Sequence, residues 1–303
     1  MAAELIDGKV ISQAILDEVK SRIEGSGVVP HLVAVQVGED PASMFYVRNQ
    51  KKKAEAVGIR YTLRQLSESI SQDELIEEIK KLNDDADVTG IILQMPLPKG
   101  MDRRAVQRAI DYRKDVEGIT PASLGLLLQD RPVLVPCTAR GAVELLEWVM
   151  EKTNDKIEGK NCVIVGRSEI VGKPIAMLML SMKRSATVTV CHSRTKNLPD
   201  KVASADILFA AVGKPQIIKG EWIKRDAIVV DVGINRVPVL DENGNPVLNE
   251  KGKPKYRTVG DVEFDVAKER AAWITPVPGG VGPMTTAILM RNTLEAALRL
   301  KGV

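Results

Sequence analysis

Short apolar runs rich in β-branched residues alternate with amphipathic stretches along almost the whole chain. The run His31–Val37 (HLVAVQV) is typical of a buried strand, and Asp40 with Pro41 predicts the start of a helix that ends at Gly58. Two further strands are predicted at residues 59–63 and 90–94, with a helix at residues 71–82 between them. This β-α-β-α order predicts a mostly parallel sheet covered by helices on both faces.

A second unit of the same kind follows a predicted helix at residues 141–152. Its strands are expected at residues 161–165, 186–190, 206–211 and 227–231, with a helix at residues 172–182 and a last helix from about residue 284 to 300. The polar segment 238–256 interrupts this pattern, and its Asn243-Gly244 and Lys251-Gly252 pairs predict a surface β-hairpin. We therefore expect two α/β domains, the second a Rossmann-like, doubly wound parallel sheet. The boundary near residue 145 falls inside a helix, and we expect a cleft between the domains.

The composition argues against several classes of protein. With 303 residues the chain is long enough for two domains, and a net charge of +3, without basic stretches among aromatics, gives no support for nucleic-acid binding. The densest apolar run, near residue 175, is far shorter than the roughly 20 residues of a membrane span, and the first residues lack the apolar core of a signal peptide. Three dispersed cysteines and two histidines predict neither a disulfide framework nor a protein-bound metal. We expect a cytoplasmic protein.

A glycine turn predicts where a dinucleotide binds. In VIVGRSEIVGKP a strand ends at Val165, Gly166 permits a tight turn, and Gly172 permits close backbone approach at a helix N-terminus. That helix end carries partial positive charge and free N–H groups, which suit a pyrophosphate. The spacing is G-x5-G rather than G-x-G-x-x-G, so the motif taken alone is more typical of ordinary turn chemistry.

The strand after this turn favours NADP over NAD. An NAD site usually carries an Asp or Glu about 20 residues after the glycine turn, where it binds the ribose hydroxyls. Here the strand ends in Cys191-His192-Ser193-Arg194, without a carboxylate. The hydroxyl of Ser193 and the guanidinium groups of Arg167 and Arg194 match a 2′-phosphate, because guanidinium binds phosphate through paired hydrogen bonds. These residues show capability rather than preference, so NAD stays open as the alternative.

Several dispersed features point to a second ligand. Tyr46, Gln50 and Lys53 are spaced four and three residues apart and share one face of a helix. Gln94 ends a predicted strand, and the segment KDVEG (114–118) carries two carboxylates at alternate positions. The loop TPVPGGVGPMT (275–285) is too rich in proline and glycine for an ordinary connection. Each of these features alone is compatible with a purely structural role.

Together and in this order, the motifs resemble the methylenetetrahydrofolate dehydrogenase/methenyltetrahydrofolate cyclohydrolase family, in its bacterial bifunctional form. The resemblance covers essentially the whole chain and rests on PASMFYVRNQ, GIILQMPLP, KDVEG, PCTARG, VGRSEIVGKP, CHSRT, VDVGINR, GDV at Gly260 and TPVPGGVGPMT. It implies an N-terminal folate domain at residues 1–145, with the last helix (284–303) packed back on it, and a NAD(P)-binding Rossmann domain at residues 146–283. It also implies a homodimer formed through the cofactor domain.

The resemblance implies a folate site and a cofactor site. Tetrahydrofolate would carry the one-carbon unit as substrate, stacked on Tyr46, and the residues that hold it would be Gln94, Asp115, Glu117, Pro278 and Gly279. The catalytic candidates are Tyr46, the Gln50 position and Asp115. NADP would lie on Gly166, Arg167, Ser168, Gly172, Ser193, Arg194 and Ile234. Hydride would pass from 5,10-methylenetetrahydrofolate to the nicotinamide, and the protein would act mostly by positioning the two ligands.

One departure from the family pattern bears on activity. The cyclohydrolase step needs a lysine four residues after the tyrosine, where this chain has Gln50. An amide cannot ionise, so we expect the dehydrogenase to be kept and the cyclohydrolase to be lost or very weak. Lys53 lies one turn further on, displaced by about 4.5 Å along the helix axis. Two smaller departures are Glu117 in place of the usual Asp and Ala139 in place of a proline, the latter predicting a looser loop.

Three alternatives stay open at this point. The chain could be fully bifunctional, with Lys53 or a water replacing the usual lysine. It could be a dehydrogenase of another small substrate, although nothing generic requires KDVEG or TPVPGGVGPMT. It could also be a catalytically silent folate- or nucleotide-binding protein. If the cyclohydrolase is lost, a separate cyclohydrolase becomes a candidate partner in the pathway.

Overall fold

The chain divides into two compact units, which the computed structural model describes over residues 2–39, 41–242, 244–248, 250 and 252–303. Asp40, Asn243 and Lys251, used above as helix and turn signals, lie outside the described residues. The six-stranded unit comprises Met1–Val10 and Gly141–Met284, and the three-stranded unit comprises Ile11–Arg140 and Thr285–Val303. Each of the three chain crossings between the units falls inside a helix: α1 (Gly8–Ser26), α6 (Cys137–Thr153) and α10 (Val281–Lys301).

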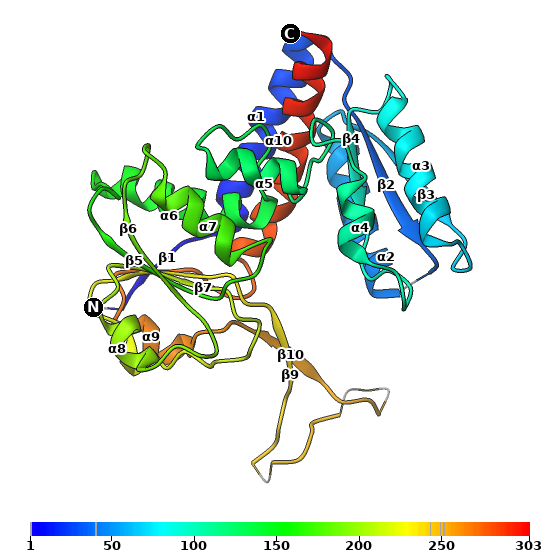
Figure 1. Ribbon diagram of the computed structural model, residues 1–303. Helices are drawn as coiled ribbons and strands as arrows, with labels where there is room; N and C mark the ends of the chain where they lie inside the picture. Colours follow the sequence, from blue (N-terminus) through cyan, green and yellow to red (C-terminus); the bar gives the residue numbers. More distant parts are fainter. Residues whose placement is uncertain (1, 40, 243, 249, 251) are drawn as a thin grey trace. The chain divides into compact units, whose positions relative to one another are not determined.

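A parallel sheet forms the centre of the six-stranded unit. Its strands lie in the order β1-β11-β8-β7-β5-β6, with every neighbouring pair parallel. They are β1 (Glu4–Leu5), β5 (Asn161–Val165), β6 (Thr187–Cys191), β7 (Ile207–Ala210), β8 (Ile228–Asp231) and β11 (Trp273–Ile274). Figure 1 shows α6 and α7 (Gly172–Leu180) on one face, and α8 (Leu198–Ala203) and α9 (Phe264–Lys268) on the other. The predicted doubly wound α/β sheet is confirmed.

The elements that the sequence analysis missed in this unit are short. β1 and β11 have two residues each, which is too few to show an alternating pattern. Their pairing nevertheless places residues 2–10 in the six-stranded unit, whereas these residues were expected above in the N-terminal domain. The 3₁₀ helix η1 (Gly220–Trp222), α8 and α9 were also not predicted.

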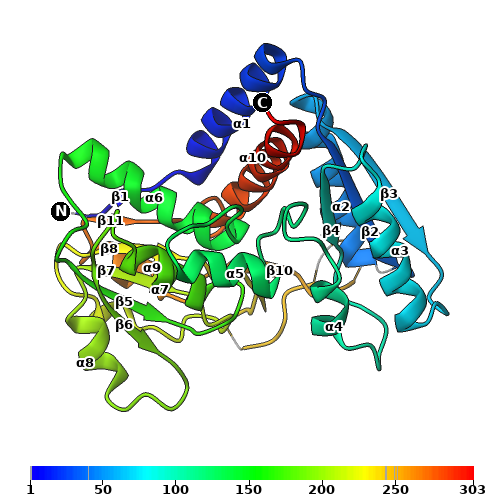
Figure 2. The same ribbon diagram turned by 45° about the horizontal axis from the view of Figure 1, so that its top comes forward.

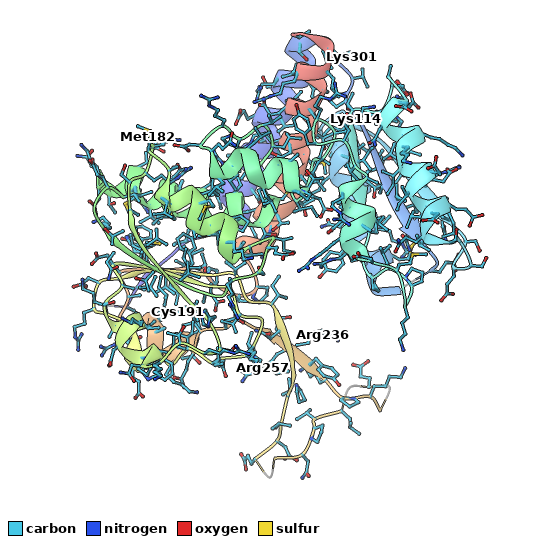
Figure 3. The ribbon with its side chains drawn as sticks, in the orientation of Figure 1. Lys114, Met182, Cys191, Arg236, Arg257 and Lys301 are labelled. Carbon is cyan, nitrogen blue, oxygen red and sulfur yellow. The ribbon has the colours of Figure 1, made fainter. Side chains whose placement is uncertain are left out.

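A polar arm leaves the six-stranded unit between β8 and α9. Its base is an antiparallel pair, β9 (Asn235–Pro238) and β10 (Tyr256–Val259), which confirms the predicted hairpin. Figures 1 and 3 show the arm extending from the body of this unit, with Arg236 and Arg257 on its two strands. Arg236 lies over the ring of Tyr256, 4.9 Å from its centroid, which stiffens the base of the arm.

The three-stranded unit has a parallel sheet of its own, with β2 in the centre. The strand order is β3-β2-β4, for β2 (His31–Val37), β3 (Arg60–Leu66) and β4 (Gly90–Leu93). Every residue of β2 is buried, His31 and Gln36 included, which confirms the predicted buried strand. The helices wholly within this unit are α2 (Pro41–Ala56), α3 (Gln72–Asp84), α4 (Arg103–Arg108) and α5 (Pro121–Leu128). Side chains from α3 and α4 pack with one face of the sheet in a single apolar cluster.

The last helix, α10, belongs to this unit from residue 285 onwards and lies beside α1, as Figures 1 and 2 both show. Arg22 on α1 donates to Glu295 on α10 at 2.7 Å. The amide of Asn292 donates to the carbonyl oxygens of Val116 and Val135, at 2.8 and 2.9 Å. These bonds tie the end of the chain to the KDVEG loop. Among the described residues, no helix has the length and apolar character to cross a membrane.

Lys114, the first residue of KDVEG, has a structural role. Its buried ammonium donates to the carbonyl oxygens of Leu82, Asn83 and Asp85 at 3.1, 2.6 and 2.7 Å. These carbonyls end α3, where a helix has no internal donors left and where a cation is favoured. Lys114 therefore caps α3 and fixes the position at which the KDVEG loop begins.

We predict that Lys114→Met destabilises the protein by about 2–4 kcal/mol, because buried carbonyl oxygens lose their donor. Chemical denaturation followed by circular dichroism measures the change. Lys80→Met is the matched control, since Lys80 lies on α3 but pairs with Glu77 at the surface. Equal stability of the two variants would contradict the capping role of Lys114.

Candidate active site

One face of α2 carries three of the residues expected at the folate site. Tyr46 is 58% exposed, while Gln50 and Lys53 are half-buried. Their spacing of four and three residues places them on the same face, as predicted. Ala139, in contrast, does not loosen a loop: it is buried within the first turn of α6.

Gln50 is the centre of a hydrogen-bonded trio. Its Oε1 accepts from Nε2 of Gln94 at 2.9 Å and from the hydroxyl of Tyr61 at 3.2 Å. Gln94 is buried just after β4, and its backbone N–H donates to Val35 at 2.8 Å. The structure thus brings together the predicted residues Gln50 and Gln94, and it adds Tyr61 from β3, which the sequence analysis missed.

Lys53 differs from the other lysines of α2. Burial lowers the pKa of its ammonium. None of the described residues forms a hydrogen bond or an ion pair with that ammonium. Lys51, by comparison, pairs with Glu55 at the surface. Lys53 is therefore partly buried, whereas Arg48, Lys51 and Lys52 of the same helix are exposed.

Asp115 organises the loop that follows it. The side chain is 1% exposed, and its carboxylate accepts from the backbone N–H of Gly118 at 3.0 Å, the backbone N–H of Thr120 at 2.7 Å and the hydroxyl of Ser123 at 2.7 Å. These bonds supply the donors that a buried carboxylate needs. Asp115 therefore fixes the conformation of the loop, and its carboxylate is already hydrogen-bonded within the protein. Glu117 is the second acid of KDVEG.

Glu117 is that second acid, and its surroundings favour the neutral form. Burial, together with the nearby Asp115 carboxylate, raises the pKa of Glu117 to about 8. None of the described residues donates a hydrogen bond to its carboxyl group. At pH 7 Glu117 is mostly a carboxylic acid, with one O–H donor and a free carbonyl acceptor for a ligand.

The glycine turn has the geometry of a dinucleotide-binding turn. Gly166 has φ +130°, and a Cβ there would collide with the carbonyl of Ala211; a Cβ on Gly172 would collide with the carbonyl of Gly166. Both positions therefore require glycine. Ser168 lies between them, and its Oγ accepts from the N–H groups of Val171 and Gly172 at 3.1 and 3.3 Å. Two of the N–H groups expected for a pyrophosphate are thus already engaged by Ser168.

The predicted ribose edge is exposed and cationic. Ser193, Arg194 and Arg167 are all exposed, and none of the described residues forms an ion pair with either guanidinium group. A short turn holds this edge, because the backbone N–H of Arg194 donates to Nδ1 of His192 at 3.1 Å. The two free guanidinium groups suit a phosphate.

Two buried aspartates, both missed by the sequence analysis, shape the next loops of this unit. Asp231 accepts from the N–H groups of Gly233, Asp261 and Val262 at 2.9, 3.0 and 2.8 Å. Burial raises the pKa of Asp231 to about 7. Asp261 accepts from the amide of Asn235 at 2.9 Å and from three successive N–H groups of residues 212–214. The sequence feature that could have indicated Asp231 and Asp261 was their position in the motifs VDVGINR and GDV.

A pocket of the six-stranded unit joins residues predicted for two different ligands. Its wall includes Ile234, predicted for the cofactor, and Pro278 and Gly279, predicted for the folate. Lys9 and Asp231 line the same pocket. The peptide bond between Val277 and Pro278 is cis. Ile234 is 60% exposed, so an apolar side chain is available to a planar ligand.

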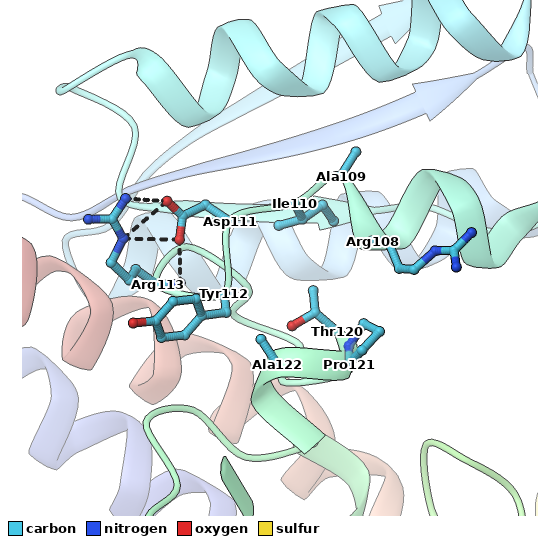
Figure 4. A pocket seen from close by; sticks show the side chains of 9 residues that line it. All are labelled: Arg108, Ala109, Ile110, Asp111, Tyr112, Arg113, Thr120, Pro121 and Ala122. Atoms are coloured by element: carbon cyan, nitrogen blue, oxygen red, sulfur yellow. Dashed lines mark hydrogen bonds and ion pairs between the residues drawn. The ribbon is translucent and has the colours of Figure 1, made fainter. Parts of the chain in front are cut away.

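A second pocket lies in the three-stranded unit, and its lining includes several charged residues. It is lined by residues 108–113 and 120–122, shown in Figure 4. Arg113 is held by an ion pair with Asp111. Thr120 connects this pocket with the folate residues, because its N–H donates to Asp115. The described residues contain no group of three or more His, Cys, Asp or Glu side chains arranged to hold a metal ion.

Comparison with known proteins matches both units. Residues 6–117 match the catalytic-domain model, and residues 136–301 the NAD(P)-binding-domain model, of tetrahydrofolate dehydrogenase/cyclohydrolase. The chain is 48% identical to the bifunctional protein FolD of Moorella thermoacetica, over 99% of this chain and 100% of that protein. It is 47% identical to the bifunctional protein FolD of Agathobacter rectalis, over 98% and 100%. It superposes with a TM-score of 0.85 on the Trypanosoma brucei methylenetetrahydrofolate dehydrogenase-cyclohydrolase, solved with NADP and an inhibitor, at 37% identity over 99% of this chain and 98% of that one.

We predict that Glu117→Gln flattens the dependence of stability on pH. In the folded protein Glu117 keeps its proton up to about pH 8. In the unfolded chain it ionises above about pH 4.3, so the free energy of unfolding falls as pH rises between these values. The amide of the variant cannot ionise, and the loss between pH 5 and 8 should shrink by about 1 kcal/mol or more. Thermal unfolding at several pH values measures this; parallel curves for both proteins would contradict the raised pKa.

Proposed function

The chain belongs to the tetrahydrofolate dehydrogenase/cyclohydrolase family, and within that family we propose that it is an NADP-dependent dehydrogenase that has lost most of its cyclohydrolase activity. The reaction is the oxidation of 5,10-methylenetetrahydrofolate to 5,10-methenyltetrahydrofolate by hydride transfer. The observation that carries the loss is Gln50. Its carbonyl is occupied by two donors, in the position where the family resemblance requires a lysine.

The residues of the six-stranded unit fit NADP. The turn from Gly166 to Gly172 packs tightly on its own backbone, because a Cβ at either glycine would meet the carbonyl of Ala211 or of Gly166. Glycines at such a strand-to-helix turn are typical of a dinucleotide-binding site. Arg167, Ser193 and Arg194 offer two cations and a hydroxyl to a 2′-phosphate. When bound, NADP supplies the hydride acceptor. The relative from Trypanosoma brucei was solved with this cofactor, which supports the same assignment here.

The residues of the three-stranded unit fit a folate. Tyr46 offers an exposed ring for stacking, and Glu117 offers both a donor and an acceptor to the pterin edge. Asp115 acts by holding the loop that carries Glu117, and we assign it a positioning role. Pro278 and Gly279, also expected at the folate site, line the pocket of the six-stranded unit. Hydride transfer needs no ionisable protein base, so positioning by these groups accounts for the dehydrogenase step.

Hydrolysis of the methenyl group makes a different demand. Water must be deprotonated or the leaving nitrogen protonated, and both steps need a group that titrates near neutral pH. The trio of Gln50, Gln94 and Tyr61 contains no such group, because burial raises the pKa of Tyr61 even further above neutrality. The trio therefore supplies no such group to hydrolysis, and among the residues assigned to the folate Glu117 is the one whose pKa lies near this range.

The full bifunctional activity is the second candidate. Two observations favour it: the relatives from Moorella and Agathobacter are named bifunctional, and Lys53 has a lowered pKa one helical turn from Gln50. We also propose a homodimer formed through the six-stranded unit, a cytoplasmic location and, if hydrolysis is lost, a separate cyclohydrolase that consumes the methenyl product.

We predict that the purified protein reduces NADP with 5,10-methylenetetrahydrofolate while methenyltetrahydrofolate accumulates. Given methenyltetrahydrofolate alone, at a pH where spontaneous hydrolysis is slow, it should show no hydrolysis above background. Gln50→Lys should then add hydrolysis at least about tenfold above that background, because it restores an ionisable group. Asn49→Lys is the control, since it adds the same charge on an exposed face. Hydrolysis by the unmodified protein that is lost in Lys53→Met would establish the bifunctional alternative.

We predict that Arg194→Gln raises the KM for NADP about tenfold, because a charged hydrogen bond to the 2′-phosphate is lost. The KM for folate and the rate with NAD should stay unchanged. Arg225→Gln is the control, an exposed arginine of the same unit away from the glycine turn. Initial rates with each cofactor measure the effect. An equal loss with NAD and NADP would show that Arg194 does not contact the 2′-phosphate.

A further inference from the structure

Tyr61 has no role in the folate and cofactor sites assigned so far, yet it reaches the residue on which hydrolysis depends. It lies on β3, paired in register with Leu32 of β2. Gln94 follows β4, on the other side of β2. The two donors therefore come from opposite edges of the sheet and meet on Gln50, which α2 carries over the same sheet.

The two donors together fix which way the Gln50 amide faces. A carbonyl oxygen has two lone pairs, and Tyr61 and Gln94 use both, at 3.2 and 2.9 Å. With the Gln94 amide in the orientation of the structure, turning the Gln50 amide over would set its NH₂ group against the NH₂ group of Gln94. None of the described residues accepts a hydrogen bond from Nε2 of Gln50. Its two N–H bonds are therefore available to a ligand.

The anchoring of Tyr61 supports a holding role. Its ring is half-buried, whereas Tyr46 on α2 is exposed. Burial raises the pKa of the Tyr61 phenol, so the hydroxyl keeps its proton across the neutral range and remains a donor. A donor that does not ionise and cannot move far is suited to holding a flexible side chain in one conformation.

We propose that Tyr61 is a positioning residue for the folate site: its hydroxyl holds the Gln50 amide so that Nε2 donates a hydrogen bond to an acceptor atom at the one-carbon end of the folate. The inference rests on the proposed dehydrogenase function. Tyr61 acts through Gln50 and does not contact the folate itself. The amide of Gln50 is thus a neutral hydrogen-bond donor of fixed orientation at the position where the family resemblance requires the ammonium group of a lysine.

A double-mutant cycle tests the proposal in the full-length protein. Tyr61→Phe should lower kcat/KM for methylenetetrahydrofolate about fivefold, mainly through KM, and leave the KM for NADP unchanged. In the Gln50→Ala background, Tyr61→Phe should have no further effect. Independent, additive losses would overturn the proposal, because Tyr61 would then act without Gln50. Tyr256→Phe, an exposed tyrosine on the arm of the six-stranded unit, is the control.

A second measurement applies if Tyr61→Phe does not fold. In a ¹⁵N–¹H spectrum of the unmodified protein, the side-chain amide pair of Gln50 is identified by its loss in Gln50→Glu. This pair should shift when tetrahydrofolate saturates the site, and an unshifted pair would overturn the proposal. The activity of the unmodified protein separates the two hypotheses. If it does not reduce NADP, the proposed function fails; if it does and the cycle is additive, only the role of Tyr61 fails.

Discussion

Burial of a carboxylate is the constraint on which both sites depend. An aspartate removed from water must receive hydrogen bonds on both oxygens, and in this chain the donors are mostly backbone N–H groups of neighbouring loops. Asp115 collects them from the KDVEG loop, while Asp231 and Asp261 collect them from three loops of the six-stranded unit. Each aspartate thereby turns loops without regular structure into rigid ones. Glu117 and Ile234 lie on those loops, and their side chains are held in place while remaining free to bind a ligand.

Much of the architecture follows from patterns that are local in sequence. Strand β2 is predicted by five apolar residues within the seven of HLVAVQV, and the hairpin is predicted by its turn signals and polarity. The candidate folate and cofactor residues are predicted from motifs whose order is specific. The pairing of β1 with β11 does not follow, because two-residue strands carry no periodic signal and join segments far apart in the chain.

The residues of the candidate site also divide into those that the sequence predicts and those that it does not. Gln50 and Gln94 were predicted from their motifs, and the structure brings them together. Tyr61 was missed because it lies in an ordinary strand, and only the sheet order places it beside Gln50. The hydrogen bonds that Asp115 accepts within its own loop could not be predicted, because an acid that binds a ligand and an acid that holds a loop look alike in sequence. The pKa of Glu117 likewise depends on burial, which no motif encodes.

The route of the chain through its two units has a consequence for synthesis on the ribosome. The three-stranded unit contains residues 11–140 but also residues 285–303, and Asn292 satisfies two carbonyl groups near its KDVEG loop. A nascent chain emerges from its N-terminal end, and domains commonly fold in that order. In this chain residues 11–140 are synthesised well before residues 285–303, with which they form one unit. The strands of the three-stranded unit stay without α10 while residues 141–284 are translated, and during this interval the chain has most need of protection from aggregation.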